Sequence, residues 1–196
     1  MTNWEKMLHG KMYNDVADSL FDLRVKAKTL FRRYNQTGDD QTELRRQLLE
    51  QLFKKVGEDV WIEPDFRCEY GKNIAIGDHT YINFDCIILD CADISIGDHV
   101  LFGPRVGLYA ANHALDLTER MNGGCVGKPI AIGDNVWLGG DVKVLGGVTI
   151  GKGSVIGCGS IVTKDIPEGV VAAGNPCRVL RKITEADRTG YLPVND

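Results

Sequence analysis

Aliphatic residues recur at every sixth position along much of the chain, and we call these positions anchors. The longest run of anchors is Ile132, Leu138, Val144, Ile150, Ile156 and Val162. Upstream, the same spacing gives Ile76, Ile82 and Ile88 and then, after a shift of two residues, Ile96, Phe102 and Leu108. An amphipathic helix needs a period of about 3.6 residues, which this region lacks. The hexapeptide repeat instead predicts short strands and corners, stacked coil on coil as a parallel β-helix.

Two further features accompany the anchors. Four residues after an anchor stands a small or β-branched side chain, in the set Thr80, Cys86, Ala92, Val100, Val106, Val136, Val142, Val148, Ser154 and Ser160. One residue after an anchor, glycine fills seven of the twelve positions, namely 77, 97, 103, 133, 139, 151 and 157. We expect the anchors and the small residues to point inward, and the glycines to relieve the backbone where the chain turns sharply.

Residues 1–57 lack the repeat and have the pattern of three short amphipathic helices. The apolar stripes are Leu20, Leu23, Ala27, Leu30, Phe31 and Tyr34 in the second helix, and Leu44, Leu48, Leu49, Leu52 and Phe53 in the third. The candidate capping residues are Thr2 with Glu5, then Asp15, then Asp40 with Glu43. Such helices must lay their apolar faces on a larger body. The sequence therefore predicts a mostly β protein with a small N-terminal helical segment.

The repeat is interrupted once. Leu108 and Ile132 are 24 positions apart where the repeat needs six, so an excursion of 18 residues leaves the coil. Long loops on rigid scaffolds commonly carry function. We divide the chain into a helical segment (1–57), a β-helix (58–183) with a loop at 109–131, and a C-terminal tail (184–196).

Composition narrows the class of protein. The 196 residues have a net charge of −4, which disfavours nucleic acid as a partner. No apolar run approaches the roughly 18 residues of a membrane span, and the first residues do not resemble a signal peptide, so we expect a soluble cytoplasmic protein. The cysteines at 68, 86, 91, 125, 158 and 177 form no C-x-x-C pair, which argues against a zinc finger and favours reduced, packed thiols.

Five segments together resemble the maltose and galactoside O-acetyltransferases. The resemblance is carried by residues 62–71, 81–84, 112–113, 127–137 and 174–178. It implies a left-handed β-helix assembled as a homotrimer, acetyl-CoA as the donor, a sugar hydroxyl as the acceptor, and active sites between subunits. The left hand rests on the resemblance alone, because parallel crossovers are usually right-handed.

The resemblance also implies a set of site residues. His113, in the excursion, is the general base, and imidazole, with an unperturbed pKa near 6.5, suits that role near neutral pH. The implied acceptor pocket comprises Asp15, Arg24, Glu69, Tyr81, Asn83, Asp90 and Cys125. At position 125 the family has Met or Glu, so Cys125 is a departure that bears on acceptor preference. Plainer interpretations remain open for Asp15 as a helix cap, Arg24 as a solvated residue and Asn83 as a corner residue that replaces Gly.

For the donor, the resemblance implies a second set. It comprises Trp137, Gly139, Gly140, Cys158, Thr163, Lys164, Arg178 and Arg181. Backbone amides near the two glycines would stabilise the thioester oxygen, and the cationic side chains would meet the phosphates of CoA. A surface aromatic and a solvated basic face are the plainer interpretations of Trp137 and of the basic residues.

Two other functions use the same fold. A zinc enzyme of the carbonic anhydrase kind needs three converging histidines, whereas His79 and His99 fall at outward corners and His113 has no second histidine in its loop. We therefore expect no metal. A non-catalytic trimeric scaffold is the other alternative.

Overall fold

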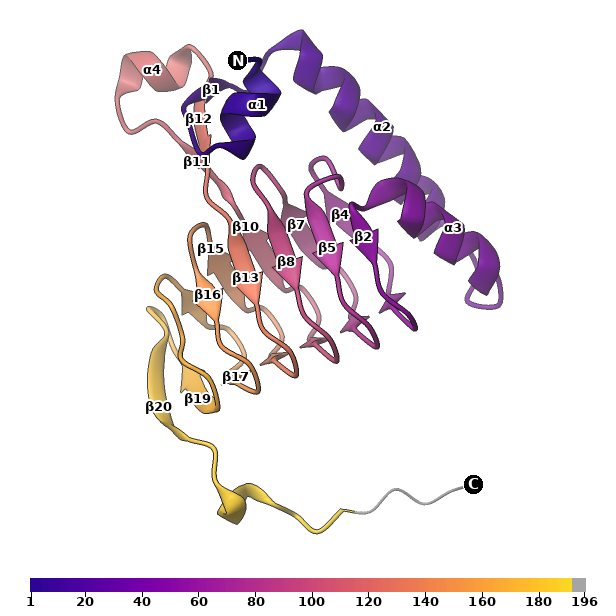
Figure 1. Ribbon diagram of the computed structural model, residues 1–196, viewed down its shortest axis with the longest axis vertical. Coiled ribbons are helices and arrows are strands. Elements are labelled where there is room, and N and C mark those ends of the chain that lie inside the picture. Colours follow the sequence, from indigo (N-terminus) through magenta and orange to yellow (C-terminus); the bar gives the residue numbers. More distant parts are fainter. Residues whose placement is uncertain (192–196) are drawn as a thin grey trace.

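The computed structural model describes residues 1–191 as a three-sided solenoid with helices at its N-terminal end (Figure 1). Residues 192–196 of the expected tail lie outside the described residues. The helices are α1 (Asn3–Leu8), α2 (Asp18–Asn35), α3 (Thr42–Leu52) and α4 (Leu117–Met121), and a 3-10 turn spans Glu185–Asp187. None of the helices within residues 1–191 is long and apolar enough to cross a membrane.

Each coil contributes one strand to each of three faces. Face 1 contains β2 (Lys55–Val56), β5 (Ile74–Ile76), β8 (Ile94–Ile96), β13 (Ile130–Ile132) and β16 (Thr149–Ile150). Face 2 contains β3 (Trp61–Ile62), β6 (Tyr81–Ile82), β9 (Leu101–Phe102), β14 (Trp137–Leu138), β17 (Val155–Ile156), β19 (Val170–Ala173) and β20 (Arg178–Lys182). Face 3 contains β4 (Arg67–Cys68), β7 (Ile87–Leu89), β10 (Gly107–Tyr109), β15 (Lys143–Leu145) and β18 (Ile161–Val162). Only β20, which runs antiparallel to β19, breaks the parallel order of these faces.

The anchors form the core, as the hexapeptide pattern predicts. On face 1, Ile76 pairs with Ile96 and Ile96 with Ile132, so that like side chains stack in register. All twelve anchors and all ten small residues that follow them are buried. The register follows from the covalent period, because a slip of one residue would turn every anchor to the outside.

Glycine is required one residue after an anchor, but not because the chain turns sharply there, as the sequence led us to expect. None of the seven has a positive φ; the left-handed residues stand three positions after anchors and include His79, Asp85, Asn135 and Gly153. The repeat glycines are instead required by the close approach of neighbouring coils. A Cβ on Gly97 would meet the Asp134 carboxylate and lie 2.7 Å from the Asp134 backbone nitrogen.

The N-terminal helices share one apolar core with the solenoid. Ala27, Phe31 and Tyr34 of α2 and three leucines of α3 (Leu48, Leu49 and Leu52) belong to the same buried cluster as the anchors. Arg45 ties this layer to the first coil: its guanidinium lies over the rings of Tyr34 and Trp61 and donates to the Ile62 carbonyl at 2.6 Å. The helices therefore close the N-terminal end of the solenoid.

Of the three expected caps, one is confirmed. Thr2 and Glu5 form a capping box at α1. Asp15 does not cap α2, whose N-cap is Ala17, and Gln41 rather than Asp40 precedes α3. Asp15 cannot cap α2 because the chain at this point is still extended along the small sheet: the Asp15 N–H donates to the Gly123 carbonyl at 3.0 Å.

The excursion folds into a small sheet with the N-terminal segment. Strand β12 (Gly124–Gly127) lies between β11 (Ala111–His113) and β1 (Tyr13–Asn14), antiparallel to both. A second apolar cluster lies against this sheet and contains Met7, Tyr13, Leu20, Tyr70, Cys91 and Cys125. The excursion is thus held by the N-terminal segment, whose strand β1 pairs with β12 (Figure 1).

We expect Gly97→Ala to lower the free energy of unfolding by about 1–3 kcal/mol, the usual cost of overpacking. Gly140→Ala is the matched control, because its Cβ would meet only Pro104 at an ordinary 3.5 Å; it should change stability by less than about 1 kcal/mol. Urea unfolding at equal chain concentration measures both. Wild-type stability of Gly97→Ala would contradict the close-approach explanation.

Candidate active site

The small sheet brings a histidine and a cysteine side by side. His113 on β11 is the cross-strand partner of Cys125 on β12, and Cys125 is in turn the partner of Tyr13 on β1. Directly opposed residues of an antiparallel pair have Cβ atoms about 4.5–5.5 Å apart. The register alone therefore places an imidazole against a thiol.

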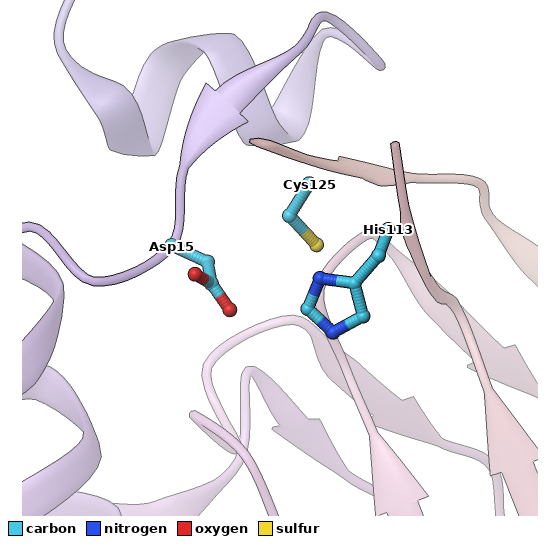
Figure 2. Close-up of side chains that lie close together, drawn as sticks. All are labelled: Asp15, His113 and Cys125. Carbon is cyan, nitrogen blue, oxygen red and sulfur yellow. The ribbon is translucent and has the colours of Figure 1, made fainter. Parts of the chain in front are cut away.

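Asp15 completes a cluster of three polar groups. Its carboxylate, the Cys125 sulfur and a ring nitrogen of His113 all lie within 4.8 Å of one another. Figure 2 shows the three side chains pointing toward one space from three different segments. His113 is exposed, Asp15 is half-buried and Cys125 is buried, so the cluster opens to solvent on the histidine side. Burial raises the pKa of the Cys125 thiol, which is therefore neutral near pH 7.

Arg24 holds the Asp15 segment in place. Its guanidinium forms an ion pair with Glu69 and donates to the backbone carbonyl of Asp15 at 2.6 Å. The same group lies 5.4 Å from the centre of the Tyr70 ring. Arg24 is thus a fixed link between α2, the segment after β1 and the loop after β4, and the structure brings Asp15, Arg24 and Glu69 together as the resemblance implies.

Asp90 lies below this loop and has no exposed surface. Its carboxylate accepts the backbone N–H groups of Glu69 at 3.0 Å and Tyr70 at 2.8 Å. Burial raises the pKa of Asp90 to about 6, while these N–H donors work in the opposite direction. The structure therefore places Asp90 where it shapes the loop that carries Glu69, away from any surface that an acceptor would touch.

Two tyrosines in the site were not indicated by the sequence. The hydroxyls of Tyr13 and Tyr70 are buried, and within residues 1–191 neither has a hydrogen-bond partner. Burial raises the pKa of both phenols, so both remain protonated donors. No repeat or cap pattern marks these positions; only their nearness in sequence to Asp15 and Glu69 offered a signal.

Tyr81 and Asn83 lie elsewhere on the chain. His113 follows β10, at the edge between faces 3 and 1, whereas Tyr81 stands on face 2 and Asn83 at the edge between faces 2 and 3. Tyr81 donates to Glu63 at 3.1 Å, and the Asn83 side chain accepts its neighbour's N–H at 2.8 Å. Asn83 thus stands at a corner, in the position that glycine takes in other coils, but its backbone is not left-handed: the left-handed residue of that corner is Asp85, with a φ of 59°.

The expected donor residues divide between two edges. Trp137, Gly139, Gly140 and Cys158 lie on face 2 or at the corners that follow it, with Trp137 52% exposed. Thr163 and Lys164 follow β18, two coils beyond His113 on the same edge, and both are exposed.

The two C-terminal arginines of the donor set differ in their partners. The exposed Arg178 on β20 donates to the backbone carbonyl of Cys177, at 2.8 Å. Arg181 forms a two-pronged ion pair with Asp187 at 2.6 and 2.8 Å, which engages its guanidinium within the chain. This ion pair and the N–H of Thr184 lower the pKa of Asp187 to about 2. Arg178 therefore keeps more of its donor capacity for a ligand than Arg181.

The remaining histidines do not gather near His113. His79 and His99 stack at 4.8 Å at the edge between faces 1 and 2, and His9 ends α1. A site of three histidines is therefore absent from a single chain within residues 1–191. What the cluster around His113 offers is one accessible base beside a carboxylate and a buried thiol, with the Arg24 guanidinium bound to the backbone carbonyl of Asp15.

Two family models match the chain. One is described as a maltose acetyltransferase hexapeptide capping motif and matches residues 6–57. The other is described as a bacterial transferase hexapeptide of six repeats and matches residues 129–164. The first model thus covers the N-terminal helical segment, and the second covers part of the solenoid.

Relatives extend the likeness over almost the whole chain. Galactoside O-acetyltransferase of Escherichia coli K12 is 44% identical over 188 residues, which cover 96% of this chain and 93% of the relative. The structure of a maltose O-acetyltransferase from Clostridium difficile 630 is 48% identical with a TM-score of 0.92, over 94% of this chain and 99% of that one. A hexapeptide-repeat acetyltransferase from Vibrio cholerae, solved with acetyl coenzyme A, is 42% identical with a TM-score of 0.86, over 94% and 100%.

These likenesses confirm the left-handed hexapeptide β-helix with its N-terminal helices. The chain therefore belongs to the maltose and galactoside O-acetyltransferase family.

Proposed function

We propose that the protein transfers an acetyl group from acetyl-CoA to a hydroxyl of a sugar, with His113 as the general base. The observation that carries this proposal is the exposed imidazole held on a rigid hairpin beside Asp15 and the Arg24–Glu69 ion pair. The imidazole accepts the hydroxyl proton as the sugar oxygen attacks the thioester carbon. The acetyl group passes directly to the sugar oxygen, the C–S bond breaks, and the imidazolium returns its proton to the departing sulfur, so that CoA leaves as the thiol and no acetyl-enzyme forms.

Carboxylate and guanidinium groups support a polar acceptor. Asp15 and Glu69 accept hydrogen bonds from sugar hydroxyls, and Arg24 donates them, so the same three side chains discriminate against acceptors that lack hydroxyls. Cys125 is buried beside the base, so it shapes the site from beneath the acceptor. Asp90 acts as a positioning residue through the loop that bears Glu69.

The proposed site requires more than one chain. His113 and the residues of face 2 lie at different edges, and a second copy is needed to bring Trp137, Tyr81 and Asn83 to the base. Face 2 carries an outward row, in register, of Trp61, Tyr81, Leu101, Trp137, Val155 and Val171. Leu101 is 49% exposed in the single chain, which favours burial of this row against a neighbour. We propose a homotrimer, whose three copies close three equivalent sites.

The donor is proposed to bind along the coils beyond His113. The Gly139 N–H already donates to the Ile156 carbonyl at 2.8 Å, whereas no acceptor within residues 1–191 takes the N–H of Gly140. Gly140 is therefore the proposed oxyanion donor. Lys164 and Arg178 are exposed and cationic, as the phosphates of CoA require, with Arg181 as a weaker contributor because it pairs with Asp187.

Loss of the base should stop the chemical step. We expect His113→Ala to lower kcat by about 10²–10⁴-fold, the usual share of a general base, with the circular dichroism spectrum unchanged. His99→Asn is the control, because His99 is remote and Asn135 occupies the equivalent corner of the next coil. The His99→Asn variant should release CoA at the wild-type rate. Near-wild-type turnover by His113→Ala would show that His113 is not the general base.

Arg24→Lys should weaken acceptor binding, because an ammonium cannot contact Glu69 and the Asp15 carbonyl in the same geometry. We expect the KM for the sugar to rise roughly tenfold with little change in the KM for acetyl-CoA. Arg32→Lys, an exposed substitution on the same helix, is the control and should change neither constant. A matching rise in both KM values for Arg24→Lys would contradict the acceptor assignment.

Lys164→Ala and Arg178→Ala should weaken the binding of acetyl-CoA. Each removes a positive charge from the proposed phosphate path, so the KM for acetyl-CoA should rise about tenfold and more than that for the sugar. Lys152→Ala removes an exposed lysine at the edge between faces 1 and 2 and serves as the matched control. Steady-state kinetics with either substrate varied separates the two assignments, and equal effects of Lys164→Ala and Lys152→Ala would refute the donor path.

A further inference from the structure

The cluster of Asp15, His113 and Cys125 has the composition of a metal site as well as that of an acceptor pocket. An imidazole nitrogen, a thiol sulfur and a carboxylate oxygen lie within 4.8 Å of one another. Zinc prefers these ligand types, commonly with three from the protein and a fourth position open. In a tetrahedral site with the usual bond lengths, ligand atoms stand about 3.5 Å apart, so the separations, all within 4.8 Å, need to shorten by at most about 1.3 Å.

The contraction is within reach of the two more accessible side chains. Cys125 is fixed in the middle strand of the small sheet, whereas His113 is exposed and Asp15 is half-buried. The backbone of Asp15 is itself held by its N–H bond to Gly123 at 3.0 Å and by Arg24 at its carbonyl. We expect rotation of the His113 and Asp15 side chains to supply this contraction, and outer contacts that hold the ligating residues in place strengthen metal sites.

We propose that these three residues bind a divalent transition-metal ion of the zinc class, and that the bound ion switches off acetyl transfer. The S–H bond of Cys125 breaks, its proton leaves to solvent, and the thiolate binds the ion. The thiolate and the Asp15 carboxylate then neutralise the two positive charges, and His113 supplies a neutral nitrogen. This differs from the expectation of no metal, which considered only histidine triplets and finger-like cysteine spacings.

The inhibitory half of the proposal rests on the proposed function. A metal-bound imidazole has no lone pair on the ligating nitrogen to accept the sugar proton, and the ion also occupies the space in front of Asp15. Metal and acceptor hydroxyl therefore compete for one position. Inhibition should be reversible by a chelator, since no bond of the chain other than S–H is broken.

Binding is tested without any assay of activity. Reduced full-length protein is titrated with Co²⁺ alone, which takes zinc sites and reveals thiolate ligation as a near-ultraviolet charge-transfer band. We expect one Co²⁺ per chain with this band, displaced by Zn²⁺. Cys125→Ser should abolish the band, and Asp15→Asn, at a half-buried position that tolerates the isosteric amide, should weaken binding by more than about tenfold. Cys158→Ser, an exposed thiol outside the cluster, should leave both band and affinity unchanged.

A missing band, or a band that survives Cys125→Ser, overturns the site. Regulation is tested separately by adding Zn²⁺ to an acetyl-transfer assay and measuring each variant against its own metal-free rate. We expect wild-type inhibition that a chelator reverses, with a Zn²⁺ concentration for half-inhibition at least about tenfold higher in Cys125→Ser. Cobalt binding together with zinc-insensitive transfer overturns the inhibition alone. Cobalt binding in a protein that acetylates no sugar is a failure of the proposed function and leaves the metal site standing.

Discussion

The close, in-register stacking of coils is the constraint on which the rest of the molecule depends. Neighbouring backbones approach so nearly that a Cβ at Gly97 has no room, and every inward position is taken by an anchor or a small side chain. The interior of such a solenoid admits only small polar side chains, such as Thr80, Ser154 and Ser160, whose hydroxyls donate to backbone carbonyls of the coils. Functional side chains must stand outward on a face, at a corner, or on a segment that leaves the coil.

The excursion follows from this constraint. The proposed base, His113, lies on a hairpin that the coil does not have to bury. β1, about 100 residues earlier in the sequence, pairs with β12 of this hairpin and holds it. The N-terminal segment therefore has two roles. Its helices cover the apolar end of the solenoid, and its strand delivers Asp15 to the histidine. Arg24 couples the two roles through its contacts with Glu69 and the Asp15 carbonyl.

The sequence predicts those features that depend on covalent spacing. The six-residue period identifies the buried anchors, and its single interruption locates the excursion, because both are properties of the chain order. The sequence does not reveal which segment pairs with the excursion. Asp15 looks like a helix cap in isolation, yet tertiary pairing of Tyr13 and Asn14 keeps the chain extended and moves the start of α2 to Asp18.

The same limit explains the site residues that differ from expectation. The burial of Asp90 beneath Glu69 and Tyr70, and the opposition of Cys125 to His113, are set by strand register between segments that lie far apart in the sequence. The family resemblance supplied the names of these residues without their contacts. Tyr13 and Tyr70 were missed because a buried phenol has no sequence signature; its significance comes from the unpaired hydroxyl.

The position of Cys125 gives the site a second property that does not depend on catalysis. A general base must keep an accessible lone pair, and the proposed base His113 stands beside the Asp15 carboxylate. The imidazole and the carboxylate are also two of the three ligands of the proposed zinc site. The third ligand is the side chain of Cys125, which lies opposite His113 in the antiparallel strand pair. A residue without a strong metal-binding atom at that position leaves a base and a carboxylate only. A thiol there makes the same geometry responsive to metal, so the choice of one inward side chain on β12 determines whether the base can be withdrawn from the reaction.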